Sequence, residues 1–334
     1  MKKKRVTLQE VAKHAGVSRA TASLVVRKSN KVSEKTRRKV LQAMDELGYI
    51  YDRVAANMRS SQPTTVGVII TDIANPYFVE LLRGVHNTLD EAGYNVFLGT
   101  TFDLEEKQNQ LLARMLEHRV GGIILCPVSD ISKESIDFIN NIDLPIVHAV
   151  REFKELNCDY VGIDYVLGAE LAVKHLINKG HRKIAFVGGT PESSAWKDRK
   201  KGYIKELNRA GIAVNDSYIV PSKISREGGS EAVRKLLSLD NPPTAIFCFN
   251  DFVAHGVIHE LKLKGLNPGK DIAVVGFDNT FESSLYTPPL TTVSSFPKLV
   301  GSQAASLLYQ RMMADNEHKQ RLILQPSLVV RESS

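Results

Sequence analysis

The sequence is poor in cysteine: only Cys126, Cys158 and Cys248 occur among 334 residues, and they form no CxxC pair. Isolated cysteines argue against a disulfide framework of the kind found in small secreted domains. Long apolar runs are also missing, since none approaches the roughly 18 residues that a membrane span needs. The basic start, Met1 to Arg5, is not followed by an apolar segment, so we expect no export signal. These absences favour a cytoplasmic protein with reduced thiols and no membrane partner.

Motifs of nucleotide-binding and catalytic sites are likewise missing. The glycine pairs at 121–122 and 188–189 belong to neither a GxGxxG motif nor a P-loop, and no serine has the spacing of a nucleophile elbow. His255 and His259 have the i, i+4 spacing of zinc ligands, but the HExxH order and a third nearby ligand are absent. The sequence therefore predicts no catalytic residue, no metal and no cofactor, and an α/β enzyme is the least supported class.

What the sequence has in excess is positive charge at one end. Residues 1–62 contain 15 Lys and Arg against 5 Asp and Glu, a net charge of +10, whereas the remaining residues together carry −3. Charge confined to one segment indicates a polyanionic partner for that segment. A disordered basic tail is the alternative, but helix signals throughout the segment argue against it.

These helix signals fall in a recognisable order. Thr7-Leu8-Gln9-Glu10 has the form of a capping box, and the helical spacing of apolar residues that follows it ends at Gly16. Ser18 is placed to cap a second short helix, and Ser33 a third. A helix, a short turn with glycine and a second helix form the helix-turn-helix unit, although a generic three-helix bundle has the same apolar pattern. The local charge favours the DNA-binding interpretation.

Side chains at the start of the second helix of such a unit reach base edges in the major groove. The predicted base contacts are Arg19, which fits a guanine, Ala20, which fits a thymine methyl, and Leu24. The residues around them that carry a hydroxyl or a positive charge are candidates for phosphate contacts, which orient the protein without reading sequence. They are Thr7, Ser18, Thr21, Ser23, Lys31 and Tyr49.

The stretch Val6–Ser23, together with Val32–Arg37 and Leu47–Tyr49, closely resembles the DNA-binding headpiece of the lactose/galactose repressor family. The segment 49–62 stands where that family has a hinge helix and linker. The resemblance implies that Met58 replaces the leucine that wedges into the minor groove at the operator centre. It also implies a homodimer on palindromic double-stranded DNA, because two half-sites need two headpieces.

Residues 63–334 alternate short β-rich runs with helical stretches. Apolar runs such as Val66–Ile70 and Ala245–Phe249 are separated by helical segments such as 76–92. This alternation predicts parallel sheets with helices on both faces. We therefore predict an α/β fold, in which a small all-α headpiece precedes a core of two parallel-sheet subdomains with a boundary near Tyr160–Asp164. A ligand cleft is expected between the two halves, beyond the carboxyl ends of their strands.

The core resembles the periplasmic sugar-binding proteins and the core of the same repressor family, through landmarks such as Asn75–Phe78 and Val275–Asn279. The resemblance implies three parts: a helix-turn-helix headpiece at 1–48, a hinge helix and linker at 49–62, and an effector-binding and dimerisation core at 63–334. Within the core, the implied subdomains are about 63–161 with 294–322, and 162–290 with 323–334.

The resemblance, with Trp196 added for its place three residues before Arg199, implies effector contacts whose side chains can donate to, accept from or pack on a sugar. They are Tyr77, Phe78, Arg151, Trp196, Arg199, Ile224, Asn250 and Asp278. A core role is the alternative for Trp196, and an ordinary loop contact for Ile224. Many relatives have Asp-Arg where this chain has Val150-Arg151. The acidic acceptor is missing there, so the ligand is expected to differ from those of relatives or to carry an anionic group.

Together these features predict a transcription regulator that represses carbohydrate-metabolism genes. Its affinity for operator DNA is expected to be controlled by a sugar or a sugar derivative. Ser23-Leu24-Val25 is similar to the maltose-regulon regulators of the family. A solute-binding protein without a DNA role is the alternative, because the core alone suggests one. The charged headpiece and the expected lack of an export signal argue against it.

Overall fold

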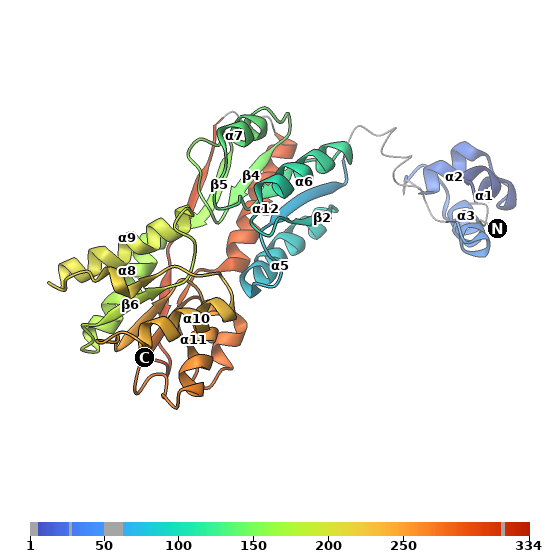
Figure 1. Cartoon of the computed structure of the whole chain (residues 1–334). Helices are drawn as coiled ribbons and strands as arrows, with labels where there is room; N and C mark the ends of the chain where they lie inside the picture. The colour runs from blue at the N-terminus through green and yellow to red at the C-terminus, as the bar shows by residue number, and fades with distance from the viewer. Residues whose placement is uncertain (1–5, 27–28, 50–62, 315–317) are drawn as a thin grey trace. The chain divides into compact units, whose positions relative to one another are not determined.

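The computed structural model of the chain describes residues 6–26, 29–49, 63–314 and 318–334. Met58 and the rest of the predicted hinge segment from 50 to 62 lie outside these residues. The chain divides into two compact units, residues 1–62 and 63–334 (Figure 1).

The described residues of the first unit form three helices, α1 (Leu8–His14), α2 (Arg19–Val26) and α3 (Glu34–Leu47). The expected capping box is present: the Thr7 hydroxyl accepts from the Glu10 amide at 3.3 Å, and the Glu10 carboxylate accepts from the Thr7 amide at 2.7 Å. Gly16 turns the chain between α1 and α2 with a φ of 67°, which favours glycine. The buried side chains of Val11, Ala22 and Val40, one from each helix, meet in a small apolar core.

The strands of the second unit form two sheets. The first has the order β11-β5-β4-β3-β1-β2, and all its described pairs are parallel. Its strands are β1 (Thr65–Ile70), β2 (Asn95–Thr100), β3 (Ile123–Leu125), β4 (Ile146–Ala149), β5 (Asp159–Ile163) and β11 (Arg321–Leu324).

The second sheet has the order β12-β10-β9-β8-β6-β7 and is parallel except for the β10–β12 pair. Its strands are β6 (Ile184–Val187), β7 (Ile219–Val220), β8 (Ala245–Cys248), β9 (Ala273–Asp278), β10 (Thr291–Ser294) and β12 (Ser327–Val329).

Helices cover both faces of each sheet. The first sheet is flanked by α5 (Pro76–Glu91), α6 (Glu105–Glu117), α7 (Lys133–Asn140) and α12 (Pro297–Met313), and the second by α8 (Tyr165–Asn178), α9 (Ser194–Arg209), α10 (Arg226–Leu237) and α11 (Asp251–Leu263). Two short 3₁₀ turns, η1 (Asp216–Tyr218) and η2 (Phe281–Ser284), belong to the second half. Helices pack in the pairs α5–α12, α8–α9 and α10–α11 (Figure 1).

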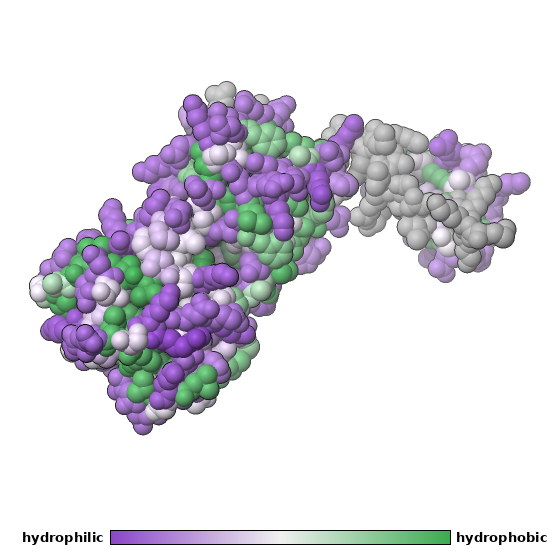
Figure 2. All heavy atoms as spheres, in the orientation of Figure 1, coloured by the Kyte–Doolittle hydropathy of each residue, from purple (hydrophilic) through white to green (hydrophobic). Residues whose placement is uncertain are grey.

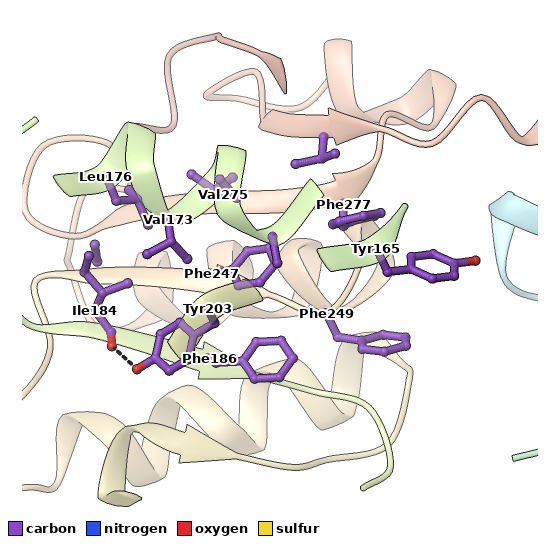
Figure 3. Close-up of a cluster of buried hydrophobic side chains, with 14 of the residues drawn as sticks. Tyr165, Val173, Leu176, Ile184, Phe186, Tyr203, Phe247, Phe249, Val275 and Phe277 are labelled. Carbon is purple, nitrogen blue, oxygen red and sulfur yellow. Dashed lines mark hydrogen bonds between the residues drawn. The ribbon is translucent and has the colours of Figure 1, made fainter. Parts of the chain in front are cut away.

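The space between a sheet and its helices is filled by aromatic and branched side chains. In the second half, Phe186 stacks on Phe247 and packs against Tyr203 of α9, whose hydroxyl donates to the Ile184 carbonyl at 2.8 Å (Figure 3). Hydrophilic side chains are spread over much of the visible face of the core, between smaller apolar patches (Figure 2). No described helix reaches the length and hydropathy of a membrane-spanning segment.

The predicted fold class is confirmed: an all-α first unit precedes an α/β core with two mainly parallel sheets. The chain passes between the halves after β5, after β10 and between β11 and β12. Positions 161 and 322, where the sequence-based subdomain limits fall, lie inside β5 and β11. The first sheet therefore includes residues up to Ile163 and Leu324.

Candidate functional site

A cavity of about 380 Å³ lies in the core where the carboxyl ends of strands from both sheets meet. Its lining comes from the segments that follow β1, β2, β4 and β5 of the first sheet, and from the end of β9 and the segments that follow β6, β7 and β8 of the second. Ligands of open α/β sheets bind at this edge, because the loops there converge and helix N-termini point into the space. The cavity therefore has the location predicted for a ligand site.

Arg199 is the central charged group of this cavity. Its side chain extends from α9 and is 3% exposed. The guanidinium lies over the rings of Tyr165, Phe249 and Phe277, 4.0 to 4.4 Å from their centroids. Nη1 donates to the carbonyl of Ala195 at 3.0 Å, whereas Nε is buried without a partner among the described residues. A planar donor held between aromatic faces, with an unused N–H, is suited to binding a hydroxyl or carbonyl oxygen of a ligand.

Asp278, at the end of β9, lies close to Arg199 in the lining of the cavity. Its Oδ1 lies 4.0 Å from Arg199 Nη2, too far for a direct hydrogen bond, and accepts from the Ser295 hydroxyl at 3.1 Å. Burial raises the pKa of the Asp278 carboxyl well above its ordinary value, and the Arg199 charge opposes that rise. Burial also lowers the pKa of Arg199. The acceptor and donor are thus held near each other but apart, a spacing that a ligand hydroxyl can bridge.

Four more of the predicted effector residues line the same cavity. Tyr77 and Phe78, from the first turn of α5, form a T-shaped aromatic pair with ring centroids 5.3 Å apart. The Tyr77 hydroxyl is buried without a partner among the described residues, and burial raises its pKa. Asn250 caps α11, its Oδ1 accepting from the Val253 amide at 3.0 Å, and Ile224 borders the cavity from the loop after β7.

Arg151 also lines the cavity, but it is already paired. Its Nη1 donates to the carboxylate of Asp103 and, at 2.9 Å, to the carbonyl of Pro127. The acidic acceptor that is missing at position 150 is therefore present at Asp103, in the segment after β2. This corrects the view that the site lacks a carboxylate beside Arg151.

Trp196 does not belong to the cavity lining, contrary to the sequence-based interpretation. Its indole N–H donates to the Gly188 carbonyl at 3.0 Å, and its ring packs on Phe186 in the core of the second half. The side chain is 6% exposed. Its position three residues before Arg199 on α9 turns it toward the sheet, so the core role considered as the alternative is the one its contacts support.

Several cavity residues were not predicted from the sequence motifs. They share a position directly after a strand or at the start of the next helix: Thr71, Asp72, Phe102, Asp103, Val150, Tyr165, Thr190, Lys223, Ser225 and Phe249. Ligands of open α/β sheets bind beyond the carboxyl ends of the strands. Applying this rule to the end of every apolar run, and not only to the family landmarks, would have predicted most of these residues.

In the first unit, the predicted base-contacting residues lie on α2. Arg19 and Ala20 are exposed in its first turn, whereas Leu24 is half-buried. Ser18 caps the helix, because its hydroxyl accepts from the Thr21 amide at 3.1 Å and lies 2.9 Å from the Thr21 hydroxyl. The start of α2 therefore presents one guanidinium and one methyl group to solvent.

The other candidate DNA contacts surround this helix start in the sequence. Thr7 is exposed at the α1 cap, and Lys31 is exposed before α3. Ser23 is half-exposed on α2, and Tyr49 is half-buried against the apolar core of the unit. The predicted wedge residue Met58 lies outside the described residues. Among those that are described, no group of three His, Cys, Asp or Glu side chains has the arrangement of a metal site.

Comparisons with known proteins agree with this division of the chain. Residues 7–52 match the family described as bacterial regulatory proteins, lacI family, and residues 63–332 match the periplasmic binding proteins and sugar binding domain of LacI family. The transcriptional repressor PurR of Pasteurella multocida is 34% identical over 98% of both chains, and catabolite control protein A of Priestia megaterium is 40% identical over 92% of both. A structure of the lac repressor dimer bound to operator and an anti-inducer has a TM-score of 0.87, with 30% identity over 99% of both chains.

Proposed function

The chain belongs to the lacI family of bacterial regulatory proteins and is a DNA-binding regulator with a ligand-binding core, and on this premise we propose that it represses carbohydrate-metabolism genes under the control of a sugar or sugar derivative. It acts in the cytoplasm as a homodimer on a palindromic operator. Neither catalysis nor a cofactor has a part in this function.

One observation carries the proposal: a DNA-binding type of headpiece and a buried ligand cavity occur in the same chain. The cavity is closed on several sides by aromatic rings and holds a donor, Arg199, and an acceptor, Asp278, that do not satisfy each other. Buried polar groups of this kind cost free energy unless a partner completes their hydrogen bonds. A ligand with hydroxyl groups supplies that partner.

On the DNA side, Arg19, Ala20 and Leu24 are assigned to base edges, because they lie along α2 from its first turn. The residues assigned to phosphate contacts are Thr7, Ser18, Thr21, Ser23, Lys31 and Tyr49. Met58 is assigned to the minor groove, where its flexible thioether can unstack a base step. The two headpieces of a dimer place these contacts on the two half-sites.

On the ligand side, Arg199, Asp278 and Asn250 are assigned to hydroxyl recognition, with Tyr77, Phe78 and Ile224 forming the wall. The cavity takes its lining from both halves of the core, so a bound ligand favours one relative arrangement of the halves over another. The arrangement of the two halves that the ligand favours then determines whether the hinge segments support operator binding.

The direct test is selection of bound sequences from a random double-stranded DNA pool by the full chain, repeated with a panel of sugars and sugar derivatives. We expect a palindromic consensus whose enrichment changes with one class of sugar. Enrichment of no consensus, or of a consensus that no panel member affects, would contradict the proposal. The solute-binding alternative predicts ligand binding without any enriched DNA.

Replacing Arg19 by alanine is expected to relax the preference at one base position in each half-site and to weaken specific binding by about 1–3 kcal/mol, because a bidentate contact to guanine is lost. Lys31→Ala is the matched control, since loss of a phosphate contact weakens all sequences alike. Competition binding against single-base operator variants measures both. If Arg19→Ala weakened every sequence equally, Arg19 would be a phosphate contact instead.

A further inference from the structure

A compact polar cluster at the rim of the ligand cavity joins Asp103, Arg151 and Ser129. The two Asp103 oxygens accept from Arg151 Nη1 and the Ser129 hydroxyl, and Oδ1 also accepts from the Ser129 amide at 2.9 Å. The Arg151 side chain is 8% exposed and also donates to the Pro127 carbonyl. The guanidinium is therefore paired with a carboxylate from the segment that follows β2 in the same half of the core.

The backbone after β2 is shaped to deliver this carboxylate. Phe102 and Asp103 both have left-handed backbone, with φ of 51° and 62°. The Phe102 amide donates to the Thr71 carbonyl at 2.7 Å, and the Asp103 amide to the Thr101 hydroxyl at 3.2 Å. Aspartate tolerates this conformation better than most residues. The turn directs the Asp103 side chain past the ends of β1 and β3 toward Arg151, which follows β4.

Position 150, directly before Arg151, carries valine where many relatives have aspartate. Val150 lines the cavity with a φ of 72°, a conformation that is unfavourable for a β-branched residue and suits Asp or Asn. Its carbonyl accepts from the Tyr165 hydroxyl at 2.8 Å, which helps to hold the strained peptide in place. The backbone at position 150 thus suits an acidic side chain, whereas the carboxylate that pairs with Arg151 in this chain comes from position 103.

The acidic and basic residues that line the cavity are equal in number. Three acidic residues and three basic residues contribute, and these are Asp72, Asp103, Asp278, Arg151, Arg199 and Lys223. Each buried guanidinium faces a carboxylate, Arg151 in direct contact with Asp103 and Arg199 at 4.0 Å from Asp278, whereas Lys223 is exposed. Arg151 is the guanidinium in direct contact with a carboxylate, so a phosphate or carboxylate on a ligand would compete with Asp103 for it and would be repelled by that carboxylate.

We infer that Asp103 determines the specificity of the cavity: by neutralising Arg151 it makes the site select an uncharged, hydroxyl-bearing ligand and reject phosphorylated or carboxylated ones. The inference rests on the proposed function, in which the cavity holds the effector. It also reverses the sequence-based expectation of an anionic group, because that expectation assumed that Arg151 has no acidic partner.

The test uses inorganic phosphate as the probe and the full chain as the sample, at constant ionic strength with chloride as the reference anion. Unfolding is followed by the fluorescence of Trp196, the single tryptophan. Because Trp196 lies in the core, its signal reports the unfolding of the core and not that of the headpiece. Phosphate is expected to raise the Tm of the wild-type core no more than chloride does. In Asp103→Asn, Arg151 is released, and phosphate is expected to bind at least about tenfold more tightly and to raise the Tm.

Two further variants control this comparison. Asp130→Asn removes an exposed carboxylate one residue beyond Ser129 that does not line the cavity, and it should behave as wild type. Asp103→Asn combined with Val150→Asp returns a carboxylate beside Arg151 and should abolish the gained phosphate binding. Equal phosphate binding by wild type and Asp103→Asn, or no loss of it in the double variant, would overturn the inference.

Matched pairs of ligands separate this inference from the proposed function. Glucose and glucose 6-phosphate, and ribose and ribose 5-phosphate, are titrated into wild type by calorimetry. Preference for the phosphorylated member of either pair would overturn the role of Asp103 and leave ligand control of operator binding intact. Failure of the DNA selection to respond to any ligand would overturn the proposed function, and the phosphate measurement would still decide whether Asp103 neutralises Arg151.

Discussion

Replacing Arg199 by alanine is expected to abolish the response to the effector and to lower effector affinity by at least about 100-fold, while operator binding in the absence of effector remains. The guanidinium is the only group in the described cavity that combines three aromatic contacts, burial and an N–H without a partner. Its loss removes a charged hydrogen bond to the ligand and opens a space between the three rings.

The fold is expected to survive this substitution. Asp278 loses its facing charge, but burial has already raised the pKa of its carboxyl, so the group can take up a proton instead of remaining an unpaired charge. Arg209→Ala is the matched control, since Arg209 is an exposed arginine on the same helix that forms ion pairs with Glu206 and Glu170 and does not line the cavity. Effector titration and operator binding are measured for both variants. Unchanged effector affinity in Arg199→Ala would remove Arg199 from the site.

Replacing Asp251 by alanine is expected to destabilise the core by about 3 kcal/mol or more near pH 5. Asp251 is fully buried at the start of α11, and its carboxyl accepts from the Thr280 amide at 2.9 Å, the Ser283 hydroxyl at 2.6 Å and the Thr292 hydroxyl at 2.5 Å. Thr280 and Ser283 lie at the start of η2 and within it, and Thr292 lies in β10. The Asp251 side chain therefore links α11 to both η2 and β10. Each donor left buried without an acceptor costs about 1–3 kcal/mol.

The effect of Asp251 depends on pH in a defined direction. Burial raises the pKa of its carboxyl to about 6, above the ordinary value, although the surrounding donors oppose the rise. A raised pKa in the folded state means that the stabilising contribution is present at low pH and is lost as the pH rises through about 6. The difference in unfolding free energy between wild type and Asp251→Ala should therefore shrink from pH 5 to pH 8.

Urea unfolding followed by Trp196 fluorescence at the two pH values measures this difference. Asp240→Ala is the control, because Asp240 is an exposed carboxylate in the same half of the core. A loss below 1 kcal/mol at pH 5, or one that grows with pH, would contradict the assigned role of Asp251.

Much of the fold could be predicted from the sequence, because most elements carry a strong local pattern. The apolar runs at β1, β3, β6 and β8 are bounded by helical stretches with clear spacing. Helix α12 was not predicted, since small residues such as Gly301 and Ala304 take the place of an apolar stripe. A Cβ at Gly301 would lie 2.1 Å from the Leu81 carbonyl, and one at Gly84 would lie 2.0 Å from the Lys298 carbonyl. Close packing of α5 on α12 explains that composition.

The short strands β11 and β12 were also not predicted as strands. They have four and three residues and are mostly half-exposed or exposed, so their apolar pattern is weak. Their place in the sheets depends on partners far away in the chain: β11 pairs with β5, and β12 with β10. The local sequence of a short strand does not indicate which distant strand it pairs with.

Arg199 and Asp278 were predicted because they lie in or beside sequence landmarks shared with the repressor family, and their side chains suit the binding of hydroxyl groups. Asp103 was missed because its role depends on left-handed backbone at two residues that are not glycine. Trp196 was misplaced because helical spacing alone does not say which residue of α9 faces the sheet. In each case the missing information was three-dimensional: the direction of a side chain rather than its type.

The central claim is that the core cavity and the headpiece are coupled, and a closed thermodynamic cycle tests it most directly. The effector Kd is measured with and without saturating operator DNA, and the operator Kd with and without saturating effector. Because coupling is reciprocal, the account predicts that both constants change by the same factor, about fivefold or more. Tight binding of both ligands with neither constant changed would contradict it.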